Sequence, residues 1–295
     1  MSSASMVSPA PAAASTATLP VLAQFEICRY ARHPLFLIGL AVNLLFCFVE
    51  PDSQWSVMGN AIVPAAGIGV LGIFVMASLT RRSQTIQAAA GIVPVPERTR
   101  SLALVAACLV PFTAGLAWWV WALLAYQHYP PPANGFPFGP VDDAWTAAVL
   151  YGEGPMACLG GPLLGILVGR WIGARAAPAL TAVGVIATCI VMQGLFEPLR
   201  RIRVIMPWTY FGGPAGIEGD PNRMLLYSGS PFWWCVYLAC LCALAVLAVL
   251  LHDREPPRRR LLMLAGGVGA ATVVAVLLAM WTGIDHTLVN PLPSS

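Results

Sequence analysis

Residues able to carry out acid–base, nucleophilic or metal chemistry are few and scattered along this chain. The histidines form no HExxH motif, and no GxSxG or DxxD cluster stands beside them; they are His33, His128, His252 and His286. The eight cysteines form no CxxC pair and mostly lie in apolar stretches, where free cysteine behaves as a small hydrophobic residue. There is no lysine, so neither a Walker A loop nor a Schiff-base enzyme is available. The sequence predicts no catalytic residue, no metal site and no cofactor.

The composition indicates which environment the chain is built for. Of its 295 residues 58% are hydrophobic and 10% charged, and the mean hydropathy is +0.74. A soluble domain carries about 25% charged residues, and a soluble fold of this length could not cover so much apolar surface. The net charge of +3 is too small to imply nucleic acid as a partner. We therefore expect an all-α, polytopic membrane helix bundle.

Apolar stretches of spanning length recur along the sequence. A membrane-spanning helix needs about 20 apolar residues. We expect a flexible tail over residues 1–20, one transmembrane domain over 21–284 with six to seven spans, and a short tail over 285–295. The expected spans cover residues 34–49, 57–79, 101–126, 144–169, 176–196, 231–251 and 261–284. Close helix contacts are predicted at Gly67, Gly69, Gly72, Gly160, Gly161 and Gly165.

The arginines give the expected orientation. With the N-terminus in the cytoplasm, twelve arginines fall on inner segments and four on outer ones. Since inner loops are rich in arginine, we expect a multi-pass cell-membrane protein with a cytoplasmic N-terminus and an extracellular C-terminus. The four exceptions share one outer segment, residues 197–231. There Leu199, Ile202, Ile205 and Met206 fall on one helical face and Arg200, Arg201 and Arg203 elsewhere, which predicts a short amphipathic helix in the outer leaflet.

Two acidic residues lie near the expected outer ends of spans. Glu153 and Glu197 either pair with Arg200 or Arg201, or lie in water at the helix ends. An acidic group at such depth is costly and often functional. These four residues are therefore a candidate polar site in the outer leaflet.

Two polar segments flank the first two expected spans. Residues 21–33, VLAQFEICRYARH, carry apolar residues on one face and Glu26 three residues before Arg29, which predicts an amphipathic helix at the inner interface. Residues 80–100 form the longest expected cytoplasmic loop, with a helix that restarts near Glu97. Each segment is either a plain membrane anchor or topogenic loop, or a docking surface for a cytoplasmic partner.

These features together resemble the permease subunit of an ABC-2 type transporter. The segment FEICRYARHPLFLIGL leads straight into the first span, and RRSQTIQAAAGIVPVPERTRSLAL is similar to the coupling segment of that family. A long outer segment separates spans five and six, so the resemblance covers most of residues 21–251. It implies a second permease protomer, identical or not, and a separate ABC ATPase subunit. The seventh expected span departs from the six-span pattern of the family.

The resemblance also implies which residues couple to the ATPase. They are Glu26, Arg29, Arg32, Arg81, Arg82, Glu97 and Arg98. The expected function is that of a membrane-spanning permease subunit of an ATP-driven exporter, which is not itself an enzyme and whose cargo passes between two protomers. A non-transporting membrane scaffold or assembly protein is the alternative. A membrane-embedded enzyme is a further one, but it requires polar groups that converge at one depth.

Overall fold

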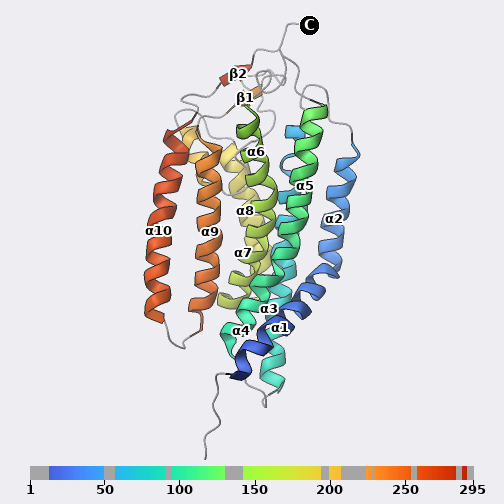
Figure 1. Cartoon of the computed structure of the whole chain (residues 1–295), viewed down its shortest axis with the longest axis vertical. Helices are drawn as coiled ribbons and strands as arrows, with labels where there is room; N and C mark the ends of the chain where they lie inside the picture. The colour runs from blue at the N-terminus through green and yellow to red at the C-terminus, as the bar shows by residue number, and fades with distance from the viewer. Residues whose placement is uncertain are drawn as a thin grey trace, which may run out of the picture.

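The computed structural model is a bundle of long helices that run up and down beside one another (Figure 1). It describes residues 13–49, 57–90, 95–129, 142–193, 199–206, 224–226, 229–253, 258–283 and 288–290. The α-helices are α1 (Ala13–Ala31), α2 (Pro34–Cys47), α3 (Val70–Ala90), α4 (Glu97–Ala107), α5 (Leu109–His128), α6 (Asp143–Tyr151), α7 (Ala157–Trp171), α8 (Ala177–Gln193), α9 (Pro231–Leu251) and α10 (Arg258–Trp281).

Shorter elements join or interrupt these helices. Two are 3₁₀-helices, η1 (Val57–Asn60) and η4 (Leu199–Ile205), and two are π-helices, η2 (Ala65–Gly69) and η3 (Gly152–Met156). Strands β1 (Met224–Leu226) and β2 (Leu288–Asn290) pair antiparallel, with Leu225 opposite Val289. We call the end of the bundle that carries α1 and α4 the lower end, and the end that carries the two strands the upper end (Figure 1).

Several helices are long and apolar enough to cross a membrane. By length and composition there are four such helices within the described residues: Val57–Thr85, Glu97–His128, Pro231–Leu251 and Arg258–Trp281. A fifth results if the bent pair Thr18–Ala31 and Pro34–Cys47 is counted as one span. The fold is thus helical with four to five candidate spans, and the larger number of six to seven stays a prediction.

The run from α6 through η3 to α7 is as long as a spanning helix but is not among these candidate spans. Its middle, Gly152–Met156, is a π-helix that contains Glu153 and Pro155. Proline has no backbone N–H, so the regular i to i−4 ladder breaks there. Most of its residues are buried, because α7 packs on α3, α5, α8 and α9. A helix with protein on most of its sides needs only a narrow apolar surface for lipid.

The chain termini differ from the tails that the sequence predicted. Helix α1 begins at Ala13, so residues 13–20 are helical and do not belong to a flexible tail. Alanine is the strongest helix former, and Ala13, Ala14 and Ala17 favour this extension. At the other end, β2 lies within the expected tail 285–295 and pairs with β1.

Helix α1 meets α2 at a bend of 57°. The bend has a local cause, because the Nδ1 atom of His33 accepts a hydrogen bond from the N–H of Leu35 and caps α2, whose first residue is Pro34. Along α1, Phe25 is 59% exposed whereas Glu26 is buried against the protein. The apolar face therefore points away from the bundle, and its insertion into the inner interface stays a prediction.

Glycines bring α3 and α7 into backbone contact, and four of them are among the six glycines at which the sequence predicts close helix contacts. A side-chain Cβ at Gly161 would overlap the carbonyl oxygen of Gly69, the last residue of η2 directly before α3, and one at Gly165 would overlap that of Ile73 in α3. A Cβ at Gly72 would lie only 2.6 Å from the Cγ atom of the Pro162 side chain. We call Gly69, Gly72, Gly161 and Gly165 the glycine seam. It lets two helices approach closely, which is how helices associate where lipid removes the hydrophobic driving force.

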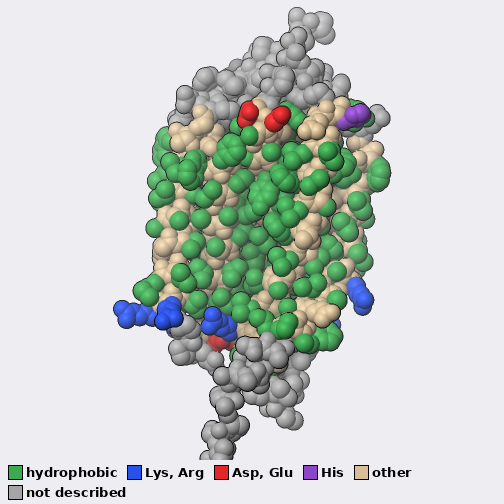
Figure 2. Space-filling model, in the orientation of Figure 1, with side chains coloured by type: hydrophobic (Ala, Val, Ile, Leu, Met, Phe, Trp, Pro, Cys, Tyr) green, Lys and Arg blue, Asp and Glu red, His purple; other side chains and the backbone are tan. Residues whose placement is uncertain are grey.

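The outside of the bundle is apolar between two polar edges. Figure 2 shows hydrophobic side chains over the middle of one face, basic side chains along its lower edge and acidic side chains with a histidine along its upper edge. Large exposed hydrophobic residues are frequent on α8 and α10, among them Leu180, Val183, Ile190, Leu262 and Val273. An apolar surface of this extent is typical of a protein embedded in a bilayer.

Candidate functional site

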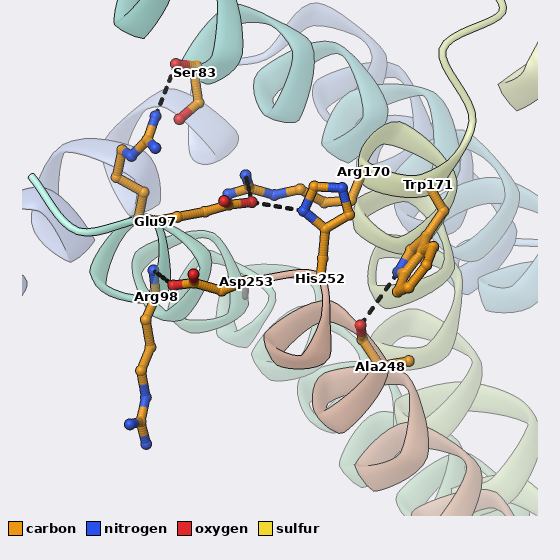
Figure 3. Close-up of polar contacts among 9 residues, drawn as sticks. Ser83, Glu97, Arg98, Arg170, Trp171, Ala248, His252 and Asp253 are labelled. Carbon is orange, nitrogen blue, oxygen red and sulfur yellow. Dashed lines mark hydrogen bonds and ion pairs between the residues drawn. The ribbon is translucent and has the colours of Figure 1, made fainter. Parts of the chain in front are cut away.

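The most extensive polar network among the described residues lies at the lower end and joins three helices. The carboxylate of Glu97, the first residue of α4, lies 3.0 Å from Nη1 of Arg170 at the end of α7. The same Glu97 oxygen lies 2.7 Å from Nδ1 of His252, which follows α9. Figure 3 shows these side chains pointing toward one another. We call Glu97, Arg170, His252 and Asp253 the lower-end network.

Asp253 supplies the cap that α4 lacks. Pro96 precedes α4 and gives no side-chain cap, so the first N–H groups of the helix need another acceptor. The Oδ2 atom of Asp253 accepts a hydrogen bond from the backbone N–H of Arg98 at 3.1 Å. A carboxylate at a helix N-terminus is also favoured by the helix dipole. The start of α4 is thus fixed to the end of α9 by two separate contacts.

A tryptophan continues the contact between α7 and α9. The indole N–H of Trp171 donates to the carbonyl oxygen of Ala248 at 3.2 Å. Its ring meets that of His252 edge to face, with centroids 5.3 Å apart. His252 therefore lies between Trp171 and Glu97, as Figure 3 shows, and its orientation is set from both sides.

The burial of Arg170 makes this network electrostatically important. Its side chain is only 1% exposed. Burial lowers the pKa of this guanidinium, while the Glu97 carboxylate raises it. Among the described residues, the Nε and Nη2 atoms of Arg170 have no hydrogen-bond partner, so Glu97 is the acceptor that compensates its burial. An arginine in this position costs free energy if that partner is removed.

The predicted coupling residues fall into four groups, and three of these groups make contacts within the protein. Glu97 belongs to the lower-end network, and Arg98 contributes its backbone to it while its side chain points away into solvent (Figure 3). Glu26 and Arg29 pair with each other at 2.7 Å within α1. Arg81 donates to the carbonyl oxygen of Ala174 at 2.7 Å, which ties α3 to the turn before α8.

Arg32 and Arg82 have exposed side chains at the same end. Because α1 packs along α4 and α3 contacts both of them, the internal pairs and the exposed arginines belong to one layer at the lower end. Sequence reasoning missed the partners Arg170, His252 and Asp253. They stand 73 to 155 residues away from Glu97 and Arg98 along the chain. Their only signal in the sequence is their position at the ends of apolar stretches, which polar residues at a membrane edge share.

The predicted outer site is described only in part. Glu153 has no exposed surface, which excludes the alternative that it lies in water at a helix end. It lies in η3, about 15 Å below Asp143 if each residue rises 1.5 Å. Glu197 lies outside the described residues. The backbones of Arg200 and Arg201 lie in η4, but their side chains are not described.

The segment η4 buries a charge that the sequence placed elsewhere. Arg203 is 2% exposed, and its neighbour Val204 packs in a cluster with Trp118, Trp145 and Trp234. Ile205, expected on the apolar face, is 43% exposed. The reason is the helix type, since a 3₁₀-helix repeats every three residues and so assigns its faces differently from an α-helix.

Aromatic rings enclose the backbone on both sides of Glu153. A Cβ at Gly152 would overlap the ring of Trp234, and one at Gly154 would lie 2.7 Å from the ring of Trp118. Within the residues that the structure describes, no group of three or more His, Cys, Asp or Glu could hold a metal ion. Comparison of the chain with protein families, curated proteins and solved structures finds no match.

Proposed function

We propose that this chain is the membrane-spanning permease subunit of an ATP-driven exporter of the ABC-2 type, and that a separate ATPase subunit docks on its lower end. The observation that carries the proposal is the connection of α4 to the core. Helix α4 packs on α1 at the surface, and its first residue, Glu97, is paired with Arg170 at the end of α7. A displacement of the α1–α4 layer would therefore reach the central helix directly.

The exposed side chains of the layer support a protein partner. Arg32, Arg82 and Arg98 are exposed, while the pairs within the network are used internally. Exposed arginines recognise carboxylates of a partner through two parallel hydrogen bonds. In this proposal the exposed arginines dock the ATPase, and Glu97 transmits its movement. The chain itself hydrolyses no ATP. The ATPase can change the conformation of the permease only if each state of the ATPase binds the two permease states with different affinities.

The orientation in the proposal follows from the arginine-rich lower end. Arginines favour the cytoplasmic side, so the lower end faces the cytoplasm and the upper end lies outside. Seven spans then place the C-terminus outside the cell, and two protomers enclose the path of the cargo. A reporter that is active only outside the cytoplasm, fused after Ser295, tests this topology. An inactive reporter on a stably inserted fusion would overturn it.

Charge reversal on the exposed layer tests the docking. We expect the double variant Arg82→Glu and Arg98→Glu to lose an ATPase that co-purifies with the wild-type chain from native membranes. The control is Arg258→Glu and Arg259→Glu, which reverses two exposed arginines at the start of α10, a helix that packs on α9. Glu26 is a poor target because it is buried. Retention of the ATPase in the first variant, or absence of an ATPase from the wild type, would favour a scaffold instead.

A second variant separates docking from transmission. Glu97→Gln removes the charge that faces Arg170 and His252 but leaves the exposed arginines in place. We expect the ATPase to stay bound to this variant. In the wild-type complex, ATP should change the hydrogen exchange of α7, and in Glu97→Gln this change should be lost. An unchanged response would show that Glu97 does not transmit the movement.

A further inference from the structure

A hydrophobic groove of about 360 Å³ lies between α7 and α9. Leucine, alanine, methionine, cysteine and glycine line it throughout, with Leu163, Leu164 and Leu167 from α7 and Leu241, Leu244 and Ala245 from α9. Its volume lies in the range of roughly 300–1,000 Å³ that is common for small-molecule sites. The lining can select only an apolar occupant, because it offers no charged or amide side chain.

The groove continues toward the lower end of the bundle. A second hollow shares Leu167 and Ala248 with the first and adds Trp171 and Ile172. The stretch from Met156 to Trp171 corresponds to about 22 Å of helix at 1.5 Å per residue. One leaflet of hydrocarbon is about 15 Å thick, half of the roughly 30 Å core. The combined groove is long enough to reach from the middle of a bilayer to its lower interface.

Trp171 marks the level at which the groove leaves the hydrocarbon. Its side chain is exposed, yet its indole N–H is held by the carbonyl oxygen of Ala248. The ring is further fixed by its edge-to-face contact with His252. Tryptophan concentrates at the headgroup level of membranes, where its ring is in hydrocarbon contact and its N–H meets polar groups.

Positive charge borders the same end. Arg258, Arg259 and Arg260 are exposed and begin α10, which packs on α9. Figure 2 shows basic side chains along the lower edge of the apolar face. Clustered arginines at a membrane surface attract anionic headgroups. They also disfavour a second copy of this chain as the occupant, because a twofold axis normal to the membrane would bring the same arginines together.

We propose that the α7–α9 groove binds one acyl chain of an anionic phospholipid from the lower leaflet, with the headgroup at Trp171 and the arginines of α10. The site is independent of the proposed docking of an ATPase, since it uses other residues and needs no nucleotide.

Photolabelling tests the site directly. The purified full chain is placed in nanodiscs that contain phosphatidylglycerol with a diazirine on its acyl chain, without ATPase or nucleotide, and labelled peptides are mapped by mass spectrometry. We expect labels on α7 and α9 peptides. Ala245→Phe fills the groove and should reduce this labelling about tenfold. Ala239→Phe is the matched control on the exposed side of the same helix and should leave it unchanged.

The headgroup is tested by charge removal and by a second lipid. Replacement of Arg258, Arg259 and Arg260 by glutamine should reduce labelling by phosphatidylglycerol to the level given by a diazirine phosphatidylcholine. If the thermal unfolding midpoint shows that Ala245→Phe misfolds, the smaller substitution Ala245→Leu replaces it in the test. Equal labelling of wild type and folded filler variants would overturn the proposal. So would a filler variant whose main effect is a changed oligomeric state, since that result assigns the groove to a second copy.

Discussion

The middle of the bundle and its lower end are held together by different kinds of contact. In the middle, the glycine seam brings the backbones of α3 and α7 together without any charged side chain. At the lower end, one carboxylate of α4 holds both Arg170 and His252, and a second carboxylate caps α4. The first contact depends on shape, and the second depends on charge and direction.

This difference bears on how each region can move. Repulsion between atoms in close contact rises steeply, so the seam fixes the separation of α3 and α7 and leaves little room for change. Ion pairs and hydrogen bonds can be exchanged for others, and such exchanges accompany many rigid-body transitions. The lower end is therefore the region that a bound partner could rearrange, while the seam keeps the core intact.

The largest effect is expected from breaking the seam. Gly161→Ala adds a methyl group that overlaps the carbonyl oxygen of Gly69, so the helices must separate. We expect a loss of about 3 kcal/mol or more in the free energy of unfolding. The measurement is unfolding in detergent followed by circular dichroism.

Gly266→Ala on α10 is the matched control for the seam. No atom lies within 4 Å of a Cβ placed there. Since alanine favours a helix over glycine by up to about 1 kcal/mol, this variant should be neutral or slightly stabilised. Equal destabilisation of the two variants would show that the cost at Gly161 does not arise from the contact with α3.

An intermediate effect is expected at the lower end. Arg170→Gln leaves Glu97 without its buried partner and should cost about 1–2 kcal/mol, less than a fully buried pair because Glu97 is 28% exposed. A double-mutant cycle with Glu97→Gln should give a coupling free energy of about 1 kcal/mol. Denaturant titration of the four proteins measures it.

The ion pair within α1 provides the comparison for this cycle. Glu26 and Arg29 lie three residues apart on one helix. Such pairs contribute about 0.2–0.5 kcal/mol. The cycle for Glu26→Gln and Arg29→Gln should therefore give a smaller coupling. Equal coupling free energies in the two cycles would mean that the Glu97–Arg170 pair, which joins two helices, is no stronger than the local Glu26–Arg29 pair within α1.

The sequence predicts the two regions to different extents. The glycines of the seam were recognisable, because small residues in apolar helices mark close contacts wherever the partner helix lies. The restart of a helix at Glu97 was also visible, since Gly91, Pro94 and Pro96 interrupt the preceding stretch. The contacts of Glu97 with Arg170 and His252 cannot be predicted from the sequence, because they depend on which helix ends meet in space. An α-helical periodicity places Arg203 away from the buried face, whereas the 3₁₀ geometry of η4 buries it.

The smallest effect concerns His33, at the bend between α1 and α2. Its Nδ1 atom accepts the N–H of Leu35 at 3.3 Å, and its Nε2 atom lies 3.4 Å from the hydroxyl of Ser78. Burial lowers the pKa of His33 below its usual value of about 6.5. The neutral form alone can accept at Nδ1, so its stabilisation is complete above about pH 6.5 and is lost as the pH falls through the lowered folded pKa.

Acidification from pH 7.5 to 5.5 should therefore loosen the start of α2 and leave the seam unchanged. We expect faster hydrogen exchange at the first amides of α2. Their local opening free energy should fall by at most about 1 kcal/mol, the usual contribution of a helix cap. Amides near Gly161 should show no such change. His33→Asn retains a capping oxygen that does not titrate, so its exchange at α2 should vary less with pH. If the wild-type response persists in His33→Asn, another group causes the pH dependence. The titration of His33 would then not distinguish the start of α2 from the glycine seam.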